Sequence, residues 1–299
     1  MASDDKRHQL LRKVALRLSP LFGDRTYIRL MYYLYTGQRL RLDQPQTMRE
    51  KLQWLKLNFR KPILTTMVDK LAVKDYVRGL LGEEYVIPVL AEWDNPSDID
   101  ISSLPSQFVL KTTHSGGNSG VVICKDKSKF NLENARRKLA AAMNVDIYKR
   151  YREWPYKDVK KKIFAERYIG SDLTDYKFYC FNGDADSALI CVDRQKGDVK
   201  YYFFDRDWHL CRYNKWGVEA PKDFTLPRPK SIGKMFELAS NLSKGYPFIR
   251  VDFYDVQGKI YFGEFTFYPS SGFSLNGRLP EVDEAFGRKI DLSIVKETT

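Results

Sequence analysis

A β-hairpin is predicted for the C-terminal stretch Arg250-Val-Asp252-Phe-Tyr-Asp-Val-Gln-Gly-Lys-Ile-Tyr-Phe-Gly-Glu264-Phe-Thr266, with its turn at Gln257-Gly258. Asp252 and Glu264 stand in otherwise apolar strand sequence, where a carboxylate is rarely left unless it is paired or bound to a cation. Because side chains alternate along a strand, Arg250 and Asp252 share one face of the first strand. Glu264 and Thr266 likewise share a face of the second strand. A hairpin can bring these four polar groups together.

Two interpretations of this hairpin follow from its residues. Grouped together, the four side chains offer hard oxygen ligands for Mg²⁺ beside a fixed guanidinium for phosphate. The alternative is an ordinary hairpin that carries a surface ion pair between Arg250 and Asp252 or Glu264. The hairpin alone leaves both interpretations open.

The composition is that of a soluble globular protein. The chain has 299 residues, of which 43% are hydrophobic and 29% charged, enough for a large core and two closely joined domains. No run reaches the ~18 apolar residues that a membrane span needs, and the N-terminus has no secretory apolar segment. The four cysteines are scattered, without a C-x-x-C pair or a Cys/His set spaced for a zinc site, so we expect free thiols in a cytoplasmic protein.

The positive charge is concentrated near the N-terminus. The net charge is +12, and residues 1–41 supply +6 of it through nine Lys or Arg and three Asp. These bases alternate with leucines, which predicts a basic amphipathic helix up to Pro20 and a second helix over Tyr27–Tyr35. Residues 6–41 would then lie peripherally on the inner face of an anionic membrane or contact an acidic glycan. The alternative is a helix that packs on its own domain with a solvated basic face.

The rest of the chain alternates helices with short strands, which predicts an α+β fold with mostly antiparallel strands. Helices are expected at Asn58–Leu81, Leu132–Tyr148 and Ser231–Lys244, the last with Ser231 as its N-cap. Strands are expected at Val86–Leu90, Phe108–Lys111, Val121–Cys124, Ile163–Ile169, Tyr176–Asn182, Ala188–Val192 and Tyr201–Phe204. Further turns are expected at Asn182-Gly183 and Lys196-Gly197.

The loop Thr112–Gly120 is rich in small residues and directly follows Lys111. Small residues let backbone N–H groups wrap a polyphosphate, and a lysine at the loop entrance supplies a point charge. A loop of this composition is also typical of a mobile turn, and it matches neither a Walker loop nor a dinucleotide fingerprint. His114 within the loop is interpreted either as a phosphate donor or as a plain polar lid residue.

Glu166 lies at the end of a predicted strand, before apolar residues. A purine needs a backbone donor and acceptor at its edge and apolar faces above and below, which such a segment offers. The alternative is a strand end with one exposed acid. Asp175 and Lys177 lie on one face of the next strand, where they can hold ribose hydroxyls and a γ-phosphate.

Taken in chain order, these features resemble the ATP-grasp superfamily, and more closely its TupA-like branch of teichuronopeptide biosynthesis. The resemblance runs from about residue 43 to about residue 290. The matching segments are Lys51-Leu-Gln-Trp-Leu-Lys56, Val68-Asp-Lys-Leu-Ala-Val73, Phe108-Val-Leu-Lys111, Gly120-Val-Val-Ile-Cys-Lys-Asp126, Arg152-Glu-Trp-Pro-Tyr156, Asp175-Tyr-Lys-Phe178 and Tyr261-Phe-Gly-Glu-Phe-Thr-Phe-Tyr-Pro269.

The resemblance implies an ATP-grasp fold, in which two antiparallel α+β lobes enclose ATP. After the basic helical segment 1–42 predicted from the charge pattern, it implies a region 43–107, a small lobe 108–169 with the phosphate loop and hinge, and a large lobe 170–299 with the metal-binding hairpin. The implied ATP ligands are Lys111, Ser115, Gly116, Gly117, Ser119, Gly120 and Lys177 for phosphates, Glu166, Arg167, Tyr168 and Ile169 for adenine, and Asp175 for ribose. Arg250 and Lys177 would be catalytic. Asp252, Glu264 and Thr266 would hold Mg²⁺, with Thr266 standing where the superfamily usually has Asn.

The implied reaction joins a carboxylate to an amine. ATP phosphorylates the carboxylate, and the amine then attacks the acyl phosphate to give an amide. We expect the carboxylate to belong to a uronic acid or a similar acidic sugar or polysaccharide precursor, in the biosynthesis of a capsule or another cell-envelope polysaccharide. The aromatic and basic segment Tyr148–Tyr156, with Trp208, Tyr213 and Trp216, provides either sugar contacts or core aromatics.

Two other functions are open at this point. A glycosyltransferase of a capsule or O-antigen pathway can bind a nucleotide sugar through a metal on a D-x-D triplet. Three such triplets occur, at Asp98-Ile-Asp100, Asp184-Ala-Asp186 and Asp205-Arg-Asp207. A non-catalytic adaptor would keep the fold and dock on a membrane complex through its basic N-terminus. Nucleic-acid binding is not expected, because the bases form no single stripe with a known reading motif.

Overall fold

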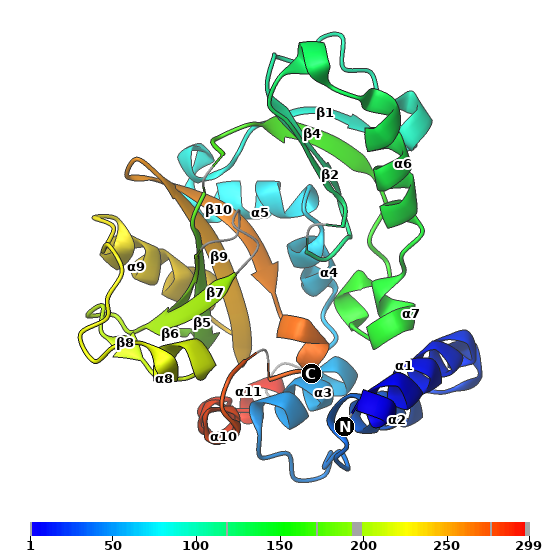
Figure 1. Cartoon of the computed structure of the whole chain (residues 1–299), viewed down its shortest axis with the longest axis vertical. Helices are drawn as coiled ribbons and strands as arrows, with labels where there is room; N and C mark the ends of the chain where they lie inside the picture. Colours follow the sequence, from blue (N-terminus) through cyan, green and yellow to red (C-terminus); the bar gives the residue numbers. More distant parts are fainter. Residues whose placement is uncertain (1, 118, 172, 193–198, 276, 297–299) are drawn as a thin grey trace. The chain divides into compact units, whose positions relative to one another are not determined.

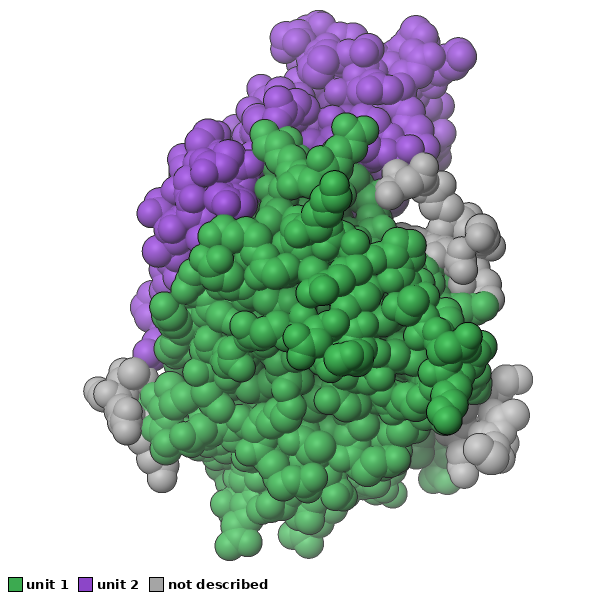
Figure 2. Space-filling view, turned by 90° about the vertical axis from the view of Figure 1, so that its left-hand side faces the viewer, with its two compact units in different colours: residues 1–60, 149–153, 173–299 green, residues 61–148, 154–172 purple. Residues whose placement is uncertain are grey.

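The computed structural model describes residues 2–117, 119–171, 173–192, 199–275 and 277–296. The chain forms two compact units, which Figure 2 distinguishes by colour. Unit 1 contains Met1–Arg60, Lys149–Glu153 and Leu173–Thr299, and unit 2 contains Lys61–Tyr148 and Trp154–Asp172. Each unit has its own antiparallel sheet and its own helices, which confirms the expected α+β class. The division into four segments stays a prediction.

Unit 2 is built on a four-stranded antiparallel sheet of order β1-β4-β2-β3. Its strands are β1 Val89–Trp93, β2 Phe108–Thr112, β3 Val121–Cys124 and β4 Ile163–Arg167, and its helices are α4 Pro62–Val68, α5 Ala72–Leu81 and α6 Leu132–Met143. Helix α6 lies along the sheet in Figure 1 and buries Ala135 and Leu139 against Phe108, Leu110 and Ile163. This apolar core fixes the strands that carry Lys111 and Glu166.

Unit 1 is built on a six-stranded antiparallel sheet of order β10-β9-β5-β6-β7-β8. Its strands are β5 Asp175–Phe181, β6 Asp184–Val192, β7 Lys200–Phe204, β8 Leu210–Cys211, β9 Phe248–Val256 and β10 Lys259–Thr266. Helix α9, Ile232–Leu242, covers one face of this sheet, and its Phe236 ring meets Phe178 edge-on at 4.9 Å. Val251 of β9 pairs with Phe178 and is fully buried on that face. By alternation, Arg250 and Asp252 therefore lie on the opposite face.

The other helices of unit 1 include those at the two ends of the chain. They are α1 Ala2–Arg17, α2 Asp24–Thr36, α3 Met48–Asn58, α8 Lys215–Glu219, α10 Pro280–Lys289 and α11 Ser293–Lys296. Helix α7, Ile147–Tyr151, contains residues of both units. Short 3-10 helices occur at Ser19–Leu21, Glu83–Tyr85, Pro96–Asp98, Lys127–Lys129, Trp154–Tyr156 and Pro269–Gly272. No helix in the described part of the chain is long and apolar enough to span a bilayer.

Two long helices expected from the sequence are wrong, because local side-chain contacts end them early. Residues 58–81 form the end of α3 and two further helices, and the Asp69 carboxylate accepts from the backbone N–H of Leu71 and Ala72, which starts α5 anew. Residues 132–148 form α6 only to Met143. Lys161 Nζ donates to the carbonyl of Met143 at 2.9 Å, and this occupies a carbonyl of the last turn.

The structure also differs from the expected cap of α9 and start of β1, and it agrees with two of the expected turns. The Ser231 hydroxyl does not cap α9, because it hydrogen-bonds the Asp255 carboxylate instead. Strand β1 begins after Pro88 rather than at Val86, as expected for a residue that lacks an N–H. The turns at Asn182-Gly183 and Gln257-Gly258 are confirmed, since each has positive φ at both residues. The turn expected at Lys196-Gly197 lies outside the described residues.

Candidate active site

A β-bulge in the hairpin β9–β10 sets the geometry of the site in unit 1. Asp252 lies directly opposite Glu264 and Arg250 lies opposite Thr266, with the register shifted between Phe262 and Glu264. Gly263 is the extra residue. Without it, the two-residue turn would place Glu264 on the other face from Asp252. A Cβ on Gly263 would lie 3.0 Å from the Asp252 carbonyl oxygen, so any other residue would push the two strands slightly apart at the bulge.

Strand β5 adds a third row of side chains to the same face. Lys177 lies opposite Asp252, and Asp175 lies two residues earlier on the same face of β5. The structure thus brings together Asp175, Lys177, Arg250, Asp252, Glu264 and Thr266. This convergence depends on register across three neighbouring strands.

The contacts within this group centre on Asp252. Arg250 donates to its two carboxylate oxygens at 2.7 Å each, and Lys177 Nζ donates at 2.6 Å. Arg250 also donates to Glu264 at 3.1 Å, and the Thr266 hydroxyl lies 3.3 Å from the same carboxylate oxygen. The side chain of Asp252 is 4% exposed, whereas that of Glu264 is 32% exposed. The interpretation as a surface ion pair is therefore wrong for Asp252.

Electrostatics keep both cations of this group charged. Burial by itself lowers the pKa of Lys177, but Asp252 and Asp175 outweigh burial and raise it. The pKa of Arg250 is likewise raised, because Asp252 and Glu264 outweigh its burial. Two cations therefore face three carboxylates, and the group keeps a net negative charge.

The donor set of this group fits a magnesium ion that is shared with phosphates. Asp252 and Glu264 offer two carboxylates side by side and Thr266 offers a hydroxyl, all hard oxygen donors. Among the described residues, no three His, Cys, Asp or Glu side chains are placed to hold a metal ion. Mg²⁺ is commonly held by one or two carboxylates with phosphates and water in the other positions, so two carboxylates suffice in the presence of a polyphosphate.

Unit 2 contains a second charged group, centred on Glu166. Its side chain is 5% exposed and forms ion pairs with Lys111 of β2 and with Lys74 of α5, the latter at 3.0 Å. Lys74 also donates to the Ile87 carbonyl at 2.8 Å. Burial raises the pKa of Glu166, but Lys111 and Lys74 outweigh it and hold that pKa below its usual value. The alternative of an exposed acid at a strand end is therefore wrong.

Lys74 was missed by the sequence reasoning, although a signal for it exists. It lies between Val73 and Val77 on the buried side of α5, where a lysine needs a partner. The Glu166 carboxylate is shared by Lys74 and Lys111, so these three side chains together have a net charge of +1.

The loop after Lys111 has a rigid base and a short tip. Thr112 and Ser115 are buried and their hydroxyls hydrogen-bond at 2.5 Å. Thr113 donates its backbone N–H to the Lys162 carbonyl at 3.0 Å. A Cβ at Gly120 would lie 2.0 Å from the Ser115 hydroxyl oxygen, so only glycine fits there. A mobile turn is thus excluded for the base of the loop.

The tip of the loop consists of residues 116–119, of which Asn118 lies outside the described residues. Gly117 has φ +59°, and the Ser119 hydroxyl donates to the Gly116 carbonyl at 2.9 Å. The Ser115 hydroxyl is engaged in the base, so backbone groups of the loop are what remains for a phosphate.

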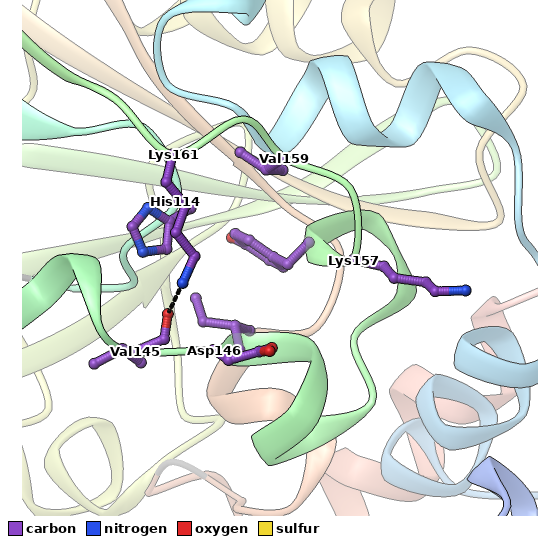
Figure 3. Close-up of a pocket in the computed structure, with 8 residues that line it drawn as sticks. His114, Val145, Asp146, Lys157, Val159 and Lys161 are labelled. Atoms are coloured by element: carbon purple, nitrogen blue, oxygen red, sulfur yellow. Dashed lines mark hydrogen bonds between the residues drawn. The ribbon is translucent and has the colours of Figure 1, made fainter. Parts of the chain in front are cut away.

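The His114 side chain lines a small pocket, shown in Figure 3. The pocket is lined by His114, Val145, Asp146, Ile147, Tyr156, Lys157, Val159 and Lys161. His114 is 3% exposed, and neither ring nitrogen makes a hydrogen bond of good geometry. Burial lowers the pKa of His114, and Lys161 and Lys70 lower it further. A plain polar lid residue would be exposed, so that alternative is wrong.

The expected adenine segment begins in a strand and leaves it. Glu166 and Arg167 end β4, and Tyr168 and Ile169 follow it half-buried. The Arg167 backbone N–H donates to the Pro88 carbonyl at 3.0 Å, while its side chain is exposed. The backbone groups that follow Arg167 are therefore the candidates for contacts with a purine.

The residues behind the alternative functions have structural partners. Asp98 and Asp100 bond neighbouring turn residues, whereas Asp184, Asp186 and Asp205 pair with Arg206, Lys289 and His209. No observation in the described part of the chain favours a sugar-nucleotide metal site.

Several aromatic and basic residues proposed for sugar contacts are core residues. Arg152 is buried and lies over the Tyr27 ring at 4.3 Å. Trp208 stacks on Phe204 with ring centroids 4.6 Å apart. For these residues the interpretation as core aromatics and their partners is the better one.

A comparison with family models agrees with the resemblance found in the sequence. Residues 50–291 match the family model described as TupA-like ATPgrasp. No curated protein matches the chain. Among solved structures, the D-alanine–D-alanine ligase of Helicobacter pylori is 15% identical, with 84% of this chain and 68% of that chain covered and a TM-score of 0.43. The Bacillus anthracis D-alanine–D-alanine ligase complexed with ATP is 18% identical, with 79% and 67% covered and a TM-score of 0.43. The N5-carboxyaminoimidazole synthetase of Staphylococcus aureus complexed with ADP is 15% identical, with 75% and 52% covered and a TM-score of 0.44.

Proposed function

Because the chain belongs to the TupA-like ATP-grasp family, we propose that it activates a carboxylate with ATP and joins it to an amine. Membership makes it an ATP-dependent ligase with the ATP-grasp fold. The observation that best supports the proposed reaction is the row Lys177–Asp252–Glu264 across three neighbouring strands. Carboxylate activation by ATP relies on positioning and electrostatics, and such a row supplies both.

In unit 2 we assign the phosphates to Lys111 and the adenine to Glu166, Arg167, Tyr168 and Ile169. The loop residues assigned to phosphate are Ser115, Gly116, Gly117, Ser119 and Gly120. Lys111 is paired with Glu166 in a group of net charge +1, so a phosphate oxygen complements that charge. Lys74 is a positioning residue here, because it shares the carboxylate that holds Lys111.

In unit 1 we assign the γ-phosphate to Lys177 and the ribose to Asp175. Asp252 and Glu264 would hold Mg²⁺, with Thr266 as a third oxygen, and the bound ion would neutralise the charge of the phosphates. Arg250 is held in one orientation by two hydrogen bonds to Asp252, which suits it to stabilise developing negative charge.

The proposed reaction has two steps. A carboxylate oxygen of the substrate attacks the γ-phosphorus, and the bond to the bridging oxygen breaks to release ADP. The amine then attacks the acyl carbon, phosphate leaves, and the nitrogen loses a proton. We assign Arg250 to the oxyanion of the second step and Lys177 to the transferred phosphoryl group.

The substrate class is proposed from the family. We propose a uronic acid or a similar acidic sugar of a cell-surface polysaccharide as the carboxylate donor, in line with the resemblance to the teichuronopeptide branch. We place the reaction in the cytoplasm, where ATP is supplied. A glycosyltransferase is not proposed, since five of the six aspartates in the D-x-D triplets are engaged with other side chains or with the backbone.

A product assay tests the proposal. Purified protein is incubated with ATP, Mg²⁺ and pools of uronic acids and amino acids, and nucleotide products are separated by chromatography. We expect ADP and phosphate, formed only when both pools are present. AMP and pyrophosphate would indicate adenylation, and UDP released from UDP-sugars would indicate glycosyl transfer; either outcome contradicts the proposal.

A further inference from the structure

The N-terminal helix α1 is fixed on α2 by one of its faces, and Figure 1 shows the two helices side by side. Ala15 is buried in the core cluster of α2. Arg12 donates to the Leu34 carbonyl at 2.9 Å and lies over the Tyr35 ring at 4.6 Å. The expectation that this helix packs on its own domain therefore holds for this face.

A neighbouring face of α1 and the following 3-10 helix is apolar and exposed. We call it the leucine face; it consists of Leu10, Leu11, Val14, Leu18 and Leu21, exposed by 63%, 40%, 42%, 44% and 78%. Leu10, Val14 and Leu18 recur every four residues, which aligns them along the helix. These five are among only thirteen large hydrophobic side chains exposed in the described residues, and they fall within twelve positions. Exposed apolar side chains gathered in this way mark an interaction surface.

Exposed positive charge accompanies the leucine face. Arg7, Lys13 and Arg17 lie on the same helix and are exposed. The nearby acid Asp24 is bound by Arg60 at 2.7 Å and by Arg152 at 3.0 Å, so it does not offset those charges at the helix surface. The leucine face is therefore accompanied by exposed basic side chains.

The combination of exposed leucines and basic residues indicates which kind of partner this face binds. An acidic glycan offers negative charge but no apolar phase for leucines, and a second copy of this face would bring like charges together. A bilayer of anionic lipids offers both an apolar boundary and phosphate headgroups. Helices with a leucine-rich face and basic residues lie in the plane of such a surface.

We propose that α1 and the 3-10 helix after it dock the enzyme on an anionic lipid bilayer. The leucine face enters the boundary between headgroups and acyl chains, and Arg7, Lys13 and Arg17 contact headgroup phosphates. The docking proposal does not depend on the ligase reaction. It goes beyond that reaction by locating the enzyme at a membrane surface.

Vesicle co-sedimentation tests this docking with the full chain. Vesicles of phosphatidylcholine alone are compared with vesicles that contain a quarter phosphatidylglycerol. Leu10→Glu/Leu21→Glu changes the two most exposed members of the leucine face. The matched control Leu80→Glu/Val218→Glu changes two equally apolar residues exposed by 56% and 50% elsewhere.

We expect the wild type and the control to sediment with the anionic vesicles and not with the neutral ones. The leucine-face variant should bind at least about tenfold more weakly, since each leucine transferred from water contributes about that factor. Lys13→Gln/Arg17→Gln should weaken binding to anionic vesicles, whereas Lys222→Gln/Arg228→Gln, exposed elsewhere, should not. Circular dichroism checks that every variant is folded.

Three results would overturn the docking proposal. One is no binding of the wild type to anionic vesicles. Another is equal binding of the leucine-face variant and its control. The third is a wild-type dimer in size-exclusion chromatography that the leucine-face variant converts to monomer, because the face would then be a contact between copies. None of these results depends on ligase turnover, so failure of docking is distinguishable from failure of the proposed reaction.

Discussion

Replacing Glu264 by Gln separates the catalytic role of this residue from its structural role. Its contacts are Arg250 at 3.1 Å and Thr266 at 3.3 Å, and its side chain is 32% exposed. A solvent-accessible ion pair of this kind contributes about 0–1 kcal/mol to the free energy of unfolding. For a chain of this size we expect the melting temperature to change by less than about 4 °C.

The effect on turnover is expected to be much larger. A removed metal-ligand charge weakens the stabilisation of the phosphoryl transition state, and losses of single electrostatic groups cost about 10²- to 10³-fold in kcat. We therefore expect Glu264→Gln to lower the rate of ADP formation by about that factor and to raise the Mg²⁺ concentration needed for half-maximal rate.

The assay compares initial rates of ADP release over a range of Mg²⁺ concentrations, together with thermal melting. Glu237→Gln is the matched control, because Glu237 pairs with Lys234 at 2.7 Å on an exposed helix face away from the assigned residues. Wild-type turnover in Glu264→Gln would refute the metal assignment. A large fall in melting temperature would show that the residue is structural.

Three further predictions concern buried groups. Gly263→Ala places a Cβ 3.0 Å from a strand carbonyl oxygen, so we expect the free energy of urea unfolding to fall by about 1–3 kcal/mol and turnover to fall as well. In Gly233→Ala the Cβ meets nothing within 4 Å, so that variant should keep the wild-type stability and turnover. Equal behaviour of the two variants would refute the role of the bulge. Lys74→Met removes one cation beside Glu166, and we expect a loss of about 1.5–3 kcal/mol at neutral pH and a raised KM for ATP. Because the folded pKa of Glu166 is below its usual 4.5, this stabilisation is present above pH 4.5 and is lost as the pH falls through the folded pKa. The difference in free energy of unfolding between wild type and Lys74→Met, measured in urea, should therefore shrink in acid. A difference that stays constant with pH contradicts the ion pair. Lys56 is fully buried and burial lowers its pKa below the usual 10.5, so the folded state releases its proton at lower pH than the unfolded state does. The free energy of unfolding should therefore rise with pH from the folded pKa of Lys56 up to 10.5. Lys56→Met should remove that rise relative to wild type, and parallel pH profiles would refute it.

Alternation along one strand was enough to predict half of the hairpin site. Arg250 and Asp252 are two residues apart, so any strand puts them on one face. Glu264 is different, because its face depends on the extra residue Gly263. A bulge is a local exception to period two, and an isolated glycine in a strand is its only trace in a single sequence.

The group around Glu166 was predicted less completely. The chain order Lys111, loop, Glu166 indicated which residues matter, but the contact with Lys74 joins positions 92 residues apart. A contact at this separation follows from how α5 packs beside the sheet, which periodicity does not specify. Two helices were predicted to be longer than they are. The reason is local, since single side chains such as Asp69 and Lys161 end or restart helical turns.

Transfer of ¹⁸O from a labelled carboxylate to phosphate tests the proposed activation most directly. The protein is incubated with ATP, Mg²⁺, amino acids and uronic acids labelled in the carboxyl group, and the released phosphate is analysed by mass spectrometry. We predict ADP and phosphate that carries one ¹⁸O atom, because the acyl phosphate breaks at its carbon–oxygen bond. Amide formed together with unlabelled phosphate, or with label in AMP, would contradict the account.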